Sequence, residues 1–183
     1  MDIYTFVLIA AAAIALLFII VYNSLISLKN QAKNAWAQID VQLKRRNDLI
    51  PNLVEAVKGY MKHEKSVFTE ITKARASIMS AKSIESKAKA SKELSSALTS
   101  FFAVAENYPT LKASENFMQL QEEISSTENK IAYSRQYYND VVMTYNIRIE
   151  IFPQSLIAKI FKFNKMESFL ANESEKKNIE IKL

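Results

Sequence analysis

The amino-acid sequence predicts an all-α protein in which an N-terminal transmembrane helix precedes a bundle of long helices. Gly59 is the only glycine among 183 residues, and there are three prolines, against average usage of roughly 7% and 5%. Sheets and hairpins need more turn residues than this. Apolar residues also recur every three or four positions over long stretches, which is the helical period.

The composition excludes several classes of chemistry. One glycine cannot build a glycine-rich phosphate loop. The absence of cysteine excludes disulfides, thiolate zinc sites and a cysteine nucleophile. His63 is the only histidine, whereas a di-iron bundle needs one on each of two helices. We therefore predict no catalytic site, no cofactor and no metal.

The N-terminal stretch has the length and composition of a membrane anchor. Residues Ile3, Tyr4, Phe6, Val21 and Tyr22 mark an apolar run of 20 residues, about 30 Å of helix and one hydrocarbon thickness. The two tyrosines stand at its ends, where amphipathic rings favour the headgroup layer. A cleaved signal peptide would have a basic start and a shorter apolar core. We predict a retained anchor over residues 1–22.

The flanking charges predict the orientation. No basic residue precedes the anchor, and Lys29 and Lys33 follow it closely. The positive-inside rule places the short N-terminus outside and the body in the cytoplasm.

The body, residues 23–170, is predicted to be a helical bundle, followed by a flexible charged tail over 171–183. A first helix follows the anchor, and we favour a break at Pro51, because proline suits the first turn of a new helix. One helix kinked at Pro51 is the alternative, since the apolar seam continues in phase. A second helix is expected to Met79, and the polar stretch 80–93 is interpreted as an exposed connection. Further helices are expected to end before Pro109 and to run from about Ala113 to Ile151.

Charged and amide residues fall beside or within these seams. Opposite charges facing each other across a bundle would explain Arg46 and Glu64 at seam positions, because a lone buried charge costs several kcal/mol. Their partners are expected among Glu106, Glu128 and Arg135. The predicted polar interhelical network, which either fixes helix register or forms a recognition groove, comprises Arg46, Glu64, Glu106, Glu128, Arg135, Asn139 and Asn146.

The segment Gln154–Leu170 is amphipathic and basic. Lys159, Lys162 and Lys165 fall on one side. Such a helix can lie on an anionic membrane. We favour the alternative that it packs against the bundle with its lysines in water, because Phe161 and Phe169 blur the division into two faces.

Three blocks of sequence resemble the LemA family. They are KRRNDLIPNLVEAVKGYMKHE (44–64), ENYPTLKASENFMQLQEEISSTENKIAYSRQYYNDVV (106–142), and the pairs Tyr145-Asn146 and Phe152-Pro153. The resemblance implies a bacterial inner-membrane protein with an up-and-down bundle of four antiparallel helices in the cytoplasm, and supplies no catalytic residues. The chain departs from the family at Lys162, where a glycine usually precedes the aromatic residue.

Three functions are compatible with these observations. The first, which we favour, is a membrane-anchored scaffold or adaptor that binds an unidentified protein partner or self-associates, with no catalysis. The second is a lipid-binding or lipid-shaping module that uses the basic C-terminal segment. The third is an enzyme with carboxylate chemistry. Nucleic acid is not an expected partner, because the net charge of +5 comes from interspersed charges of both signs.

Overall fold

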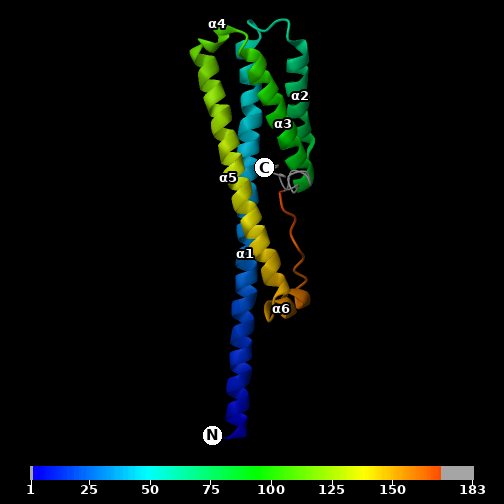
Figure 1. Cartoon of the computed structure of the whole chain (residues 1–183). Helices are drawn as coiled ribbons and strands as arrows, with labels where there is room; N and C mark the ends of the chain where they lie inside the picture. Colours follow the sequence, from blue (N-terminus) through cyan, green and yellow to red (C-terminus); the bar gives the residue numbers. More distant parts are fainter. Residues whose placement is uncertain (1, 170–183) are drawn as a thin grey trace, which may run out of the picture. The chain divides into compact units, whose positions relative to one another are not determined.

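The computed structural model describes residues 2–169 and is all-α over that range, with no strand. Figure 1 shows the helices in chain order. Their bounds are α1 Ile3–Val57, α2 Lys65–Ser80, α3 Ile84–Ala105, α4 Pro109–Lys112, α5 Glu115–Glu150 and α6 Gln154–Ile160. The predicted fold class, with antiparallel packing of long helices behind an apolar N-terminal helix, is confirmed. The predicted tail over 171–183 lies outside the described residues.

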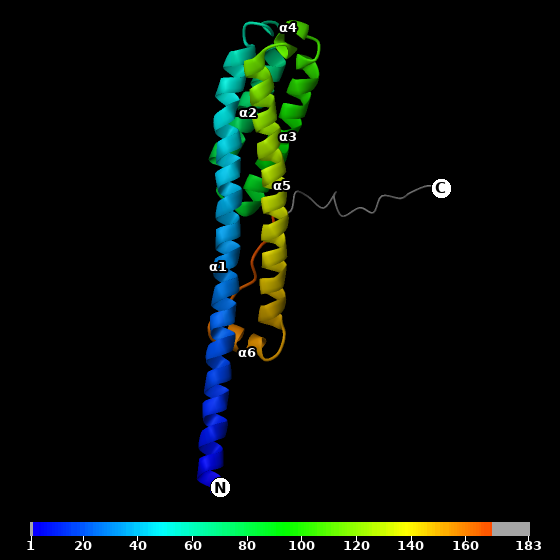
Figure 2. The ribbon, with the colours of Figure 1, turned by 90° about the vertical axis from the view of Figure 1, so that its left-hand side faces the viewer.

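The chain forms two compact units, and α1 and α5 contribute to both. Of the described residues, the first unit comprises 2–37 and 136–168, and the second comprises 38–135 with Phe169. In the first unit, α6 lies beside α1 at the end of α5 (Figures 1 and 2). In the second unit, α2 and α3 pack with the later part of α1 and the earlier part of α5.

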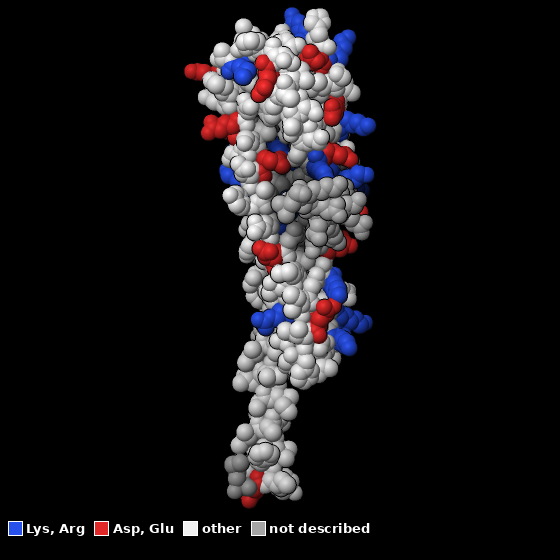
Figure 3. Space-filling view, in the orientation of Figure 1, with Lys and Arg blue, Asp and Glu red and all other residues white. Residues whose placement is uncertain are grey.

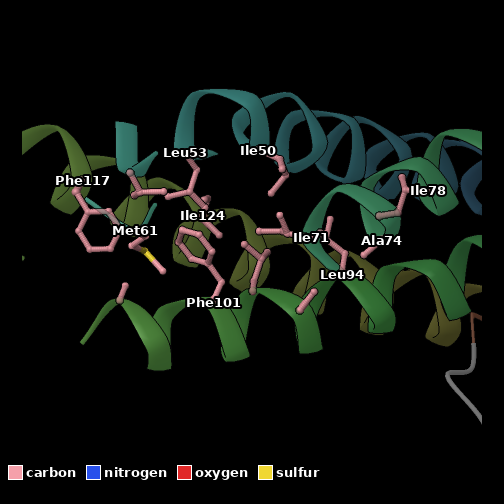
Figure 4. Close-up of a cluster of buried hydrophobic side chains, with 14 of the residues drawn as sticks. Ile50, Leu53, Met61, Ile71, Ala74, Ile78, Leu94, Phe101, Phe117 and Ile124 are labelled. Carbon is pink, nitrogen blue, oxygen red and sulfur yellow. The ribbon is translucent and has the colours of Figure 1, made fainter. Parts of the chain in front are cut away.

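The core of the second unit is apolar and draws on each of its helices. In Figure 4, Ile50 and Leu53 of α1 point toward Ile71 of α2 and Phe101 of α3. The rings of Phe101 and Phe68 pack edge to face with their centroids 6.3 Å apart. Aromatic quadrupoles favour this arrangement. These side chains occupy the three- and four-residue steps seen in the sequence, so the helical period selects the buried face.

Pro51 lies inside α1, so the expected break at this residue is wrong, and so is a second helix running from Pro51 to Met79. An interior proline leaves the carbonyl four residues earlier without its amide donor. That carbonyl belongs to Asn47, and Arg75 Nε of α2 donates to it at 3.4 Å. A neighbouring helix therefore supplies the donor that Pro51 lacks, and α1 continues.

The stretch 80–93 is not an exposed connection, because α3 begins within it. Ser83 caps α3, and the Ser83 and Ser86 side chains bond reciprocally to backbone amides. Ala88, Ala90 and Ser91 are buried. The interpretation failed because small residues occupy the inner face of this helix, and they give a weak hydrophobic signal.

The expected helix Gln154–Leu170 is shorter than predicted, since α6 ends at Ile160. Lys162 has a positive φ of 54°. The amide of Phe163 donates to the Ala158 carbonyl at 2.9 Å, and that of Lys162 to the Lys159 carbonyl at 3.3 Å. These bonds form a Schellman motif, whose left-handed position is usually glycine. The chain keeps the turn without the glycine.

The pairing of Arg75 with the Asn47 carbonyl can be measured by a double-mutant cycle. We expect Arg75→Ala to cost about 1 kcal/mol of unfolding free energy, because it leaves a buried carbonyl unpaired. In a Pro51→Ala background the cost should fall, since the introduced alanine supplies its own amide to that carbonyl. Urea unfolding of the four proteins in detergent gives the coupling energy, and equal costs in both backgrounds would refute the pairing.

The turn after α6 predicts a stabilising substitution. Lys162→Gly should raise stability by about 0.5–1 kcal/mol, because glycine has no Cβ to crowd the left-handed conformation. Lys159→Gly is the matched control: it removes another exposed lysine but lies within α6 and should destabilise by a similar amount. Thermal melts followed by circular dichroism compare the two, and a lower melting temperature for Lys162→Gly would contradict the assignment.

Candidate functional site

A buried arginine forms the polar centre of the second unit. The side chain of Arg46 on α1 is fully buried, with 0% exposure, at a position that the apolar seam would otherwise fill. It forms an ion pair with Glu128 of α5. Glu128 is one of the three partners expected from the sequence, and its side chain is 45% exposed. The cation is thus inside the bundle and the carboxylate stands at its edge.

Two serines of α3 complete the shell around Arg46. One guanidinium nitrogen, Nη1, donates to Ser95 Oγ at 2.9 Å. The other, Nη2, donates to the hydroxyl and the carbonyl oxygen of Ser91, at 2.9 Å and 3.2 Å. The Ser95 hydroxyl in turn lies 2.9 Å from Glu128 Oε1. A single side chain therefore links α1, α3 and α5.

Neither serine was expected from the sequence, although the residues around them carry a usable signal. Ala88, Ser91, Ser95 and Leu98 follow one another at steps of three, four and three, which continues the apolar seam of α3 toward its N-terminus. Small and hydroxyl residues at inner positions mark a place where something large must fit opposite. Here the large group opposite the small residues is the guanidinium of Arg46.

Burial lowers the pKa of Arg46 to about 10, because an apolar surrounding disfavours the charged form. The side chain nevertheless carries its charge at neutral pH. Its Nε is buried without a hydrogen-bond partner among the described residues. The ion pair with Glu128 therefore offsets a real desolvation cost.

No ion pair among the described residues joins Glu64, Glu106 or Arg135 to this network. Glu64 accepts a hydrogen bond from the Tyr108 hydroxyl at 2.9 Å instead of meeting a charge, and this bond is the main reason that the pKa of Tyr108 is raised. Glu106 is exposed as the C-cap residue of α3. Arg135 is half-buried. The expectation that Glu64 pairs with one of the named charges is wrong.

The two asparagines of the predicted network lie in the first unit. The amide of Asn146 bonds twice to the backbone of Met166, with both distances 2.9 Å. Asn139 is half-buried. Nearby, Tyr138 and Tyr145 donate to the carbonyls of Glu167 and Asn164, at 2.8 and 3.0 Å, and burial raises the pKa of both phenols. The predicted network residues of α5 are thus divided between two local structures, with Glu128 in the second unit and Asn146 in the first.

A small hollow of about 150 Å³ lies in the second unit between α3 and α5. Its lining includes Ser91, Lys92, Ser95, Glu128, Arg135 and Phe169. The one carboxylate in this lining is held by Arg46. Among the described residues, no group of three or more His, Cys, Asp or Glu could hold a metal ion.

The predicted anchor residues divide into two environments. Ile3, Tyr4 and Phe6 are 60–80% exposed. Val21 is 8% exposed and packs with Tyr145, Ile149 and Ile157, and Tyr22 is half-buried against the same cluster. One side of the last turn of the apolar stretch is therefore covered by protein, while Ile19 and Ile20 stay exposed.

The structure contains one helix that is long and apolar enough to cross a membrane, within the part of the chain that it describes. The most apolar continuous stretch of 18 residues in α1 contains no buried residue. Figure 3 shows this end of the chain as a largely uncharged surface. The fold therefore defines a class: an all-α bundle protein with one candidate membrane-spanning helix at the N-terminus.

Comparison with known proteins makes the assignment more specific. The LemA family model matches residues 35–183, and the chain belongs to this family. It is 26% identical to Protein LemA of Metamycoplasma hominis, over 86% of this chain and 73% of that protein. It is 25% identical to the magnetosome protein MamQ of Magnetospirillum gryphiswaldense, over 81% of this chain and 64% of that protein. MamQ 2 of Paramagnetospirillum magneticum matches over the same shares at 25% identity.

The asymmetry of the ion pair predicts unequal effects of removing each partner. Glu128→Ala should cost about 3–5 kcal/mol, because it leaves a buried cation uncompensated. Arg46→Met should cost much less, since it fills the same volume with apolar atoms and leaves a carboxylate that water can reach. Urea unfolding of the full-length chain in detergent measures both.

Arg135→Ala is the matched control for this comparison. Arg135 lies seven residues from Glu128 on the same helix and is half-buried, so its removal should change stability by about 0.5 kcal/mol or less. Equal losses of unfolding free energy for Glu128→Ala and Arg46→Met would contradict the argument that an unpaired buried arginine costs more than an unpaired, solvent-accessible glutamate.

Proposed function

We propose that the chain is a single-pass protein of the bacterial inner membrane that acts as a scaffold or adaptor. The N-terminal helix spans the bilayer with its short N-terminus outside, and the body lies in the cytoplasm. The basic residues Lys29 and Lys33 after the apolar stretch support this orientation. The body binds a protein partner or a second copy of itself and catalyses no reaction.

The observation that carries this proposal is an apolar face left exposed on α5. Tyr137, Met143 and Ile147 are 49–57% exposed. At 100° per residue they fall within an arc of about 120°, which they share with the exposed polar residues Asp140 and Thr144, and we refer to the three apolar residues as the α5 face. Exposed apolar groups gathered on one face mark interaction surfaces more often than singly scattered ones do. This face therefore favours a binding role.

Two further observations support a scaffold over an enzyme. Glu128, the carboxylate beside the hollow of the second unit, is held in an ion pair with Arg46, which leaves it a poor general acid or base. In addition, the MamQ relatives are named for a cellular structure, the magnetosome, and not for a reaction. A role in assembly is compatible with both.

A second candidate function, binding or shaping of the lipid surface, is favoured by a different set of exposed residues. Phe152 and Ile160, between the end of α5 and the end of α6, are 78% and 64% exposed. Apolar exposure beside a membrane-spanning helix is typical of contact with lipid. This role is compatible with an adaptor, because the two surfaces use different residues.

Site-specific photocrosslinking in cells tests the scaffold proposal. A photoreactive phenylalanine analogue at Met143 should give discrete adducts with another protein or with a second copy, which mass spectrometry would identify. The control carries the same analogue at Asn34, an exposed polar position on α1 in the same unit. A foreign protein indicates an adaptor, and self-adducts indicate a scaffold. Adduct yields no higher at Met143 than at Asn34 would count against both.

A further inference from the structure

The turn between α5 and α6 presents apolar side chains to the surroundings. Phe152 is 78% exposed, Ile160 64%, Leu156 54%, Phe161 46% and Ile151 43%. We call these five residues the corner face. Their neighbours Ile157 and Ala158 are buried at 2–3% exposure, so α6 already packs one apolar side against the first unit. The corner face is apolar surface that the described residues leave partly exposed.

Contacts with α1 fix the depth of the corner face relative to the apolar stretch. The centroid of the Phe161 ring lies 4.6 Å from that of the Tyr22 ring and 5.8 Å from that of the Phe18 ring. Phe163 contacts Tyr22 from another side at 6.0 Å. Phe18 and Tyr22 form the last turn of a 20-residue apolar stretch about 30 Å long. The corner face therefore lies where hydrocarbon gives way to headgroups.

The charges around the corner suit a negatively charged surface. Residues 151–166 contain Lys159, Lys162 and Lys165 and no acidic residue. Lys165 forms an ion pair with Glu150, whereas Lys159 and Lys162 are exposed. Basic residues beside an apolar face are the combination that binds anionic lipid.

Side chains of α5 hold this arrangement in place. Asn146 bonds to the backbone of Met166 through both its amide oxygen and its amide nitrogen. Tyr145 and Tyr138 donate to the carbonyls of Asn164 and Glu167. The segment after α6 thus runs back along α5, and the corner is presented by a packed structure.

We propose that the corner face is a second membrane contact, which inserts into the headgroup layer of an anionic bilayer on the side where the body lies. The apolar side chains reach the boundary of the hydrocarbon, and Lys159 and Lys162 face lipid phosphates. The inference deepens the second candidate function, contact with the lipid surface, by naming the residues that enter the bilayer and the charge of the lipid. It rests on the proposed membrane crossing of α1.

The absence of cysteine from the chain allows a direct test. Each single-cysteine variant of the full-length protein carries one nitroxide label and is reconstituted in vesicles containing phosphatidylglycerol. Phe152→Cys and Leu156→Cys report on the corner face. Ile14→Cys reports on the anchor. Asn30→Cys is exposed on α1 about 12 Å beyond Tyr22, and it serves as the reference for a label in water. Electron paramagnetic resonance compares collisions with oxygen, which enters lipid, and with a water-soluble nickel chelate.

Labels at Phe152 and Leu156 are expected to show a ratio of oxygen to nickel collisions between those at Ile14 and Asn30. Values equal to Asn30, with Ile14 in lipid, would overturn the second contact and leave the membrane crossing intact. An Ile14 label in water would remove the crossing and the inference together. Dipolar broadening at Phe152 that disappears on dilution with unlabelled protein would assign the corner to a second copy and overturn the lipid assignment.

A charge variant tests the choice of anionic lipid. Lys159→Glu with Lys162→Glu should move the Leu156 label toward water in phosphatidylglycerol vesicles. Replacing phosphatidylglycerol with phosphatidylcholine should have a similar effect on the unchanged chain. A label depth that responds to neither change would overturn the assignment of an anionic surface.

Discussion

The buried guanidinium of Arg46 constrains the second unit, because a buried cation needs an anion and hydrogen-bond acceptors on the helices around it. Its guanidinium has lost its water, so its donors must find oxygen atoms on neighbouring helices. Ser91 and Ser95 of α3 and Glu128 of α5 provide them. Only one mutual register of the three helices brings these groups together, because a shift of one turn would move a partner by about 5 Å.

The neighbouring positions on α1 depend on the same register. Asn47 is the next residue along, and its carbonyl is the one that Pro51 leaves without an amide. With α1 held in place by Arg46, that carbonyl faces α2, where Arg75 reaches it. The helix thus passes through a proline without ending and continues to Val57.

In the first unit, the polar side chains of α5 form hydrogen bonds with main-chain groups, whereas in the second unit they form an ion pair. Tyr138, Tyr145 and Asn146 of α5 bond to the main chain of the segment after α6. These bonds replace the hydrogen bonds that an irregular segment would otherwise make to water. The result places Phe161 and Phe163 against Tyr22, at the end of the apolar stretch. The same packing leaves Phe152 and Ile160 exposed. The hydrogen bonds that hold the segment after α6 in place therefore also determine which apolar side chains stay at the surface.

The sequence by itself determined the all-α class, the apolar N-terminal helix and the long α5, since composition and the helical period depend only on residue order. It also indicated that Arg46 needed an opposite charge, with Glu128 among three candidates, because a lone buried charge is too costly. Tertiary structure alone decided the remaining points. Continuity through Pro51 was one such point, and there Arg75 of another helix donates to the carbonyl that the proline leaves without an amide. The burial of Ser91 depended on the large side chain opposite it, and the end of α6 at Ile160 depended on contacts that hold Lys162 in a conformation that lysine by itself disfavours.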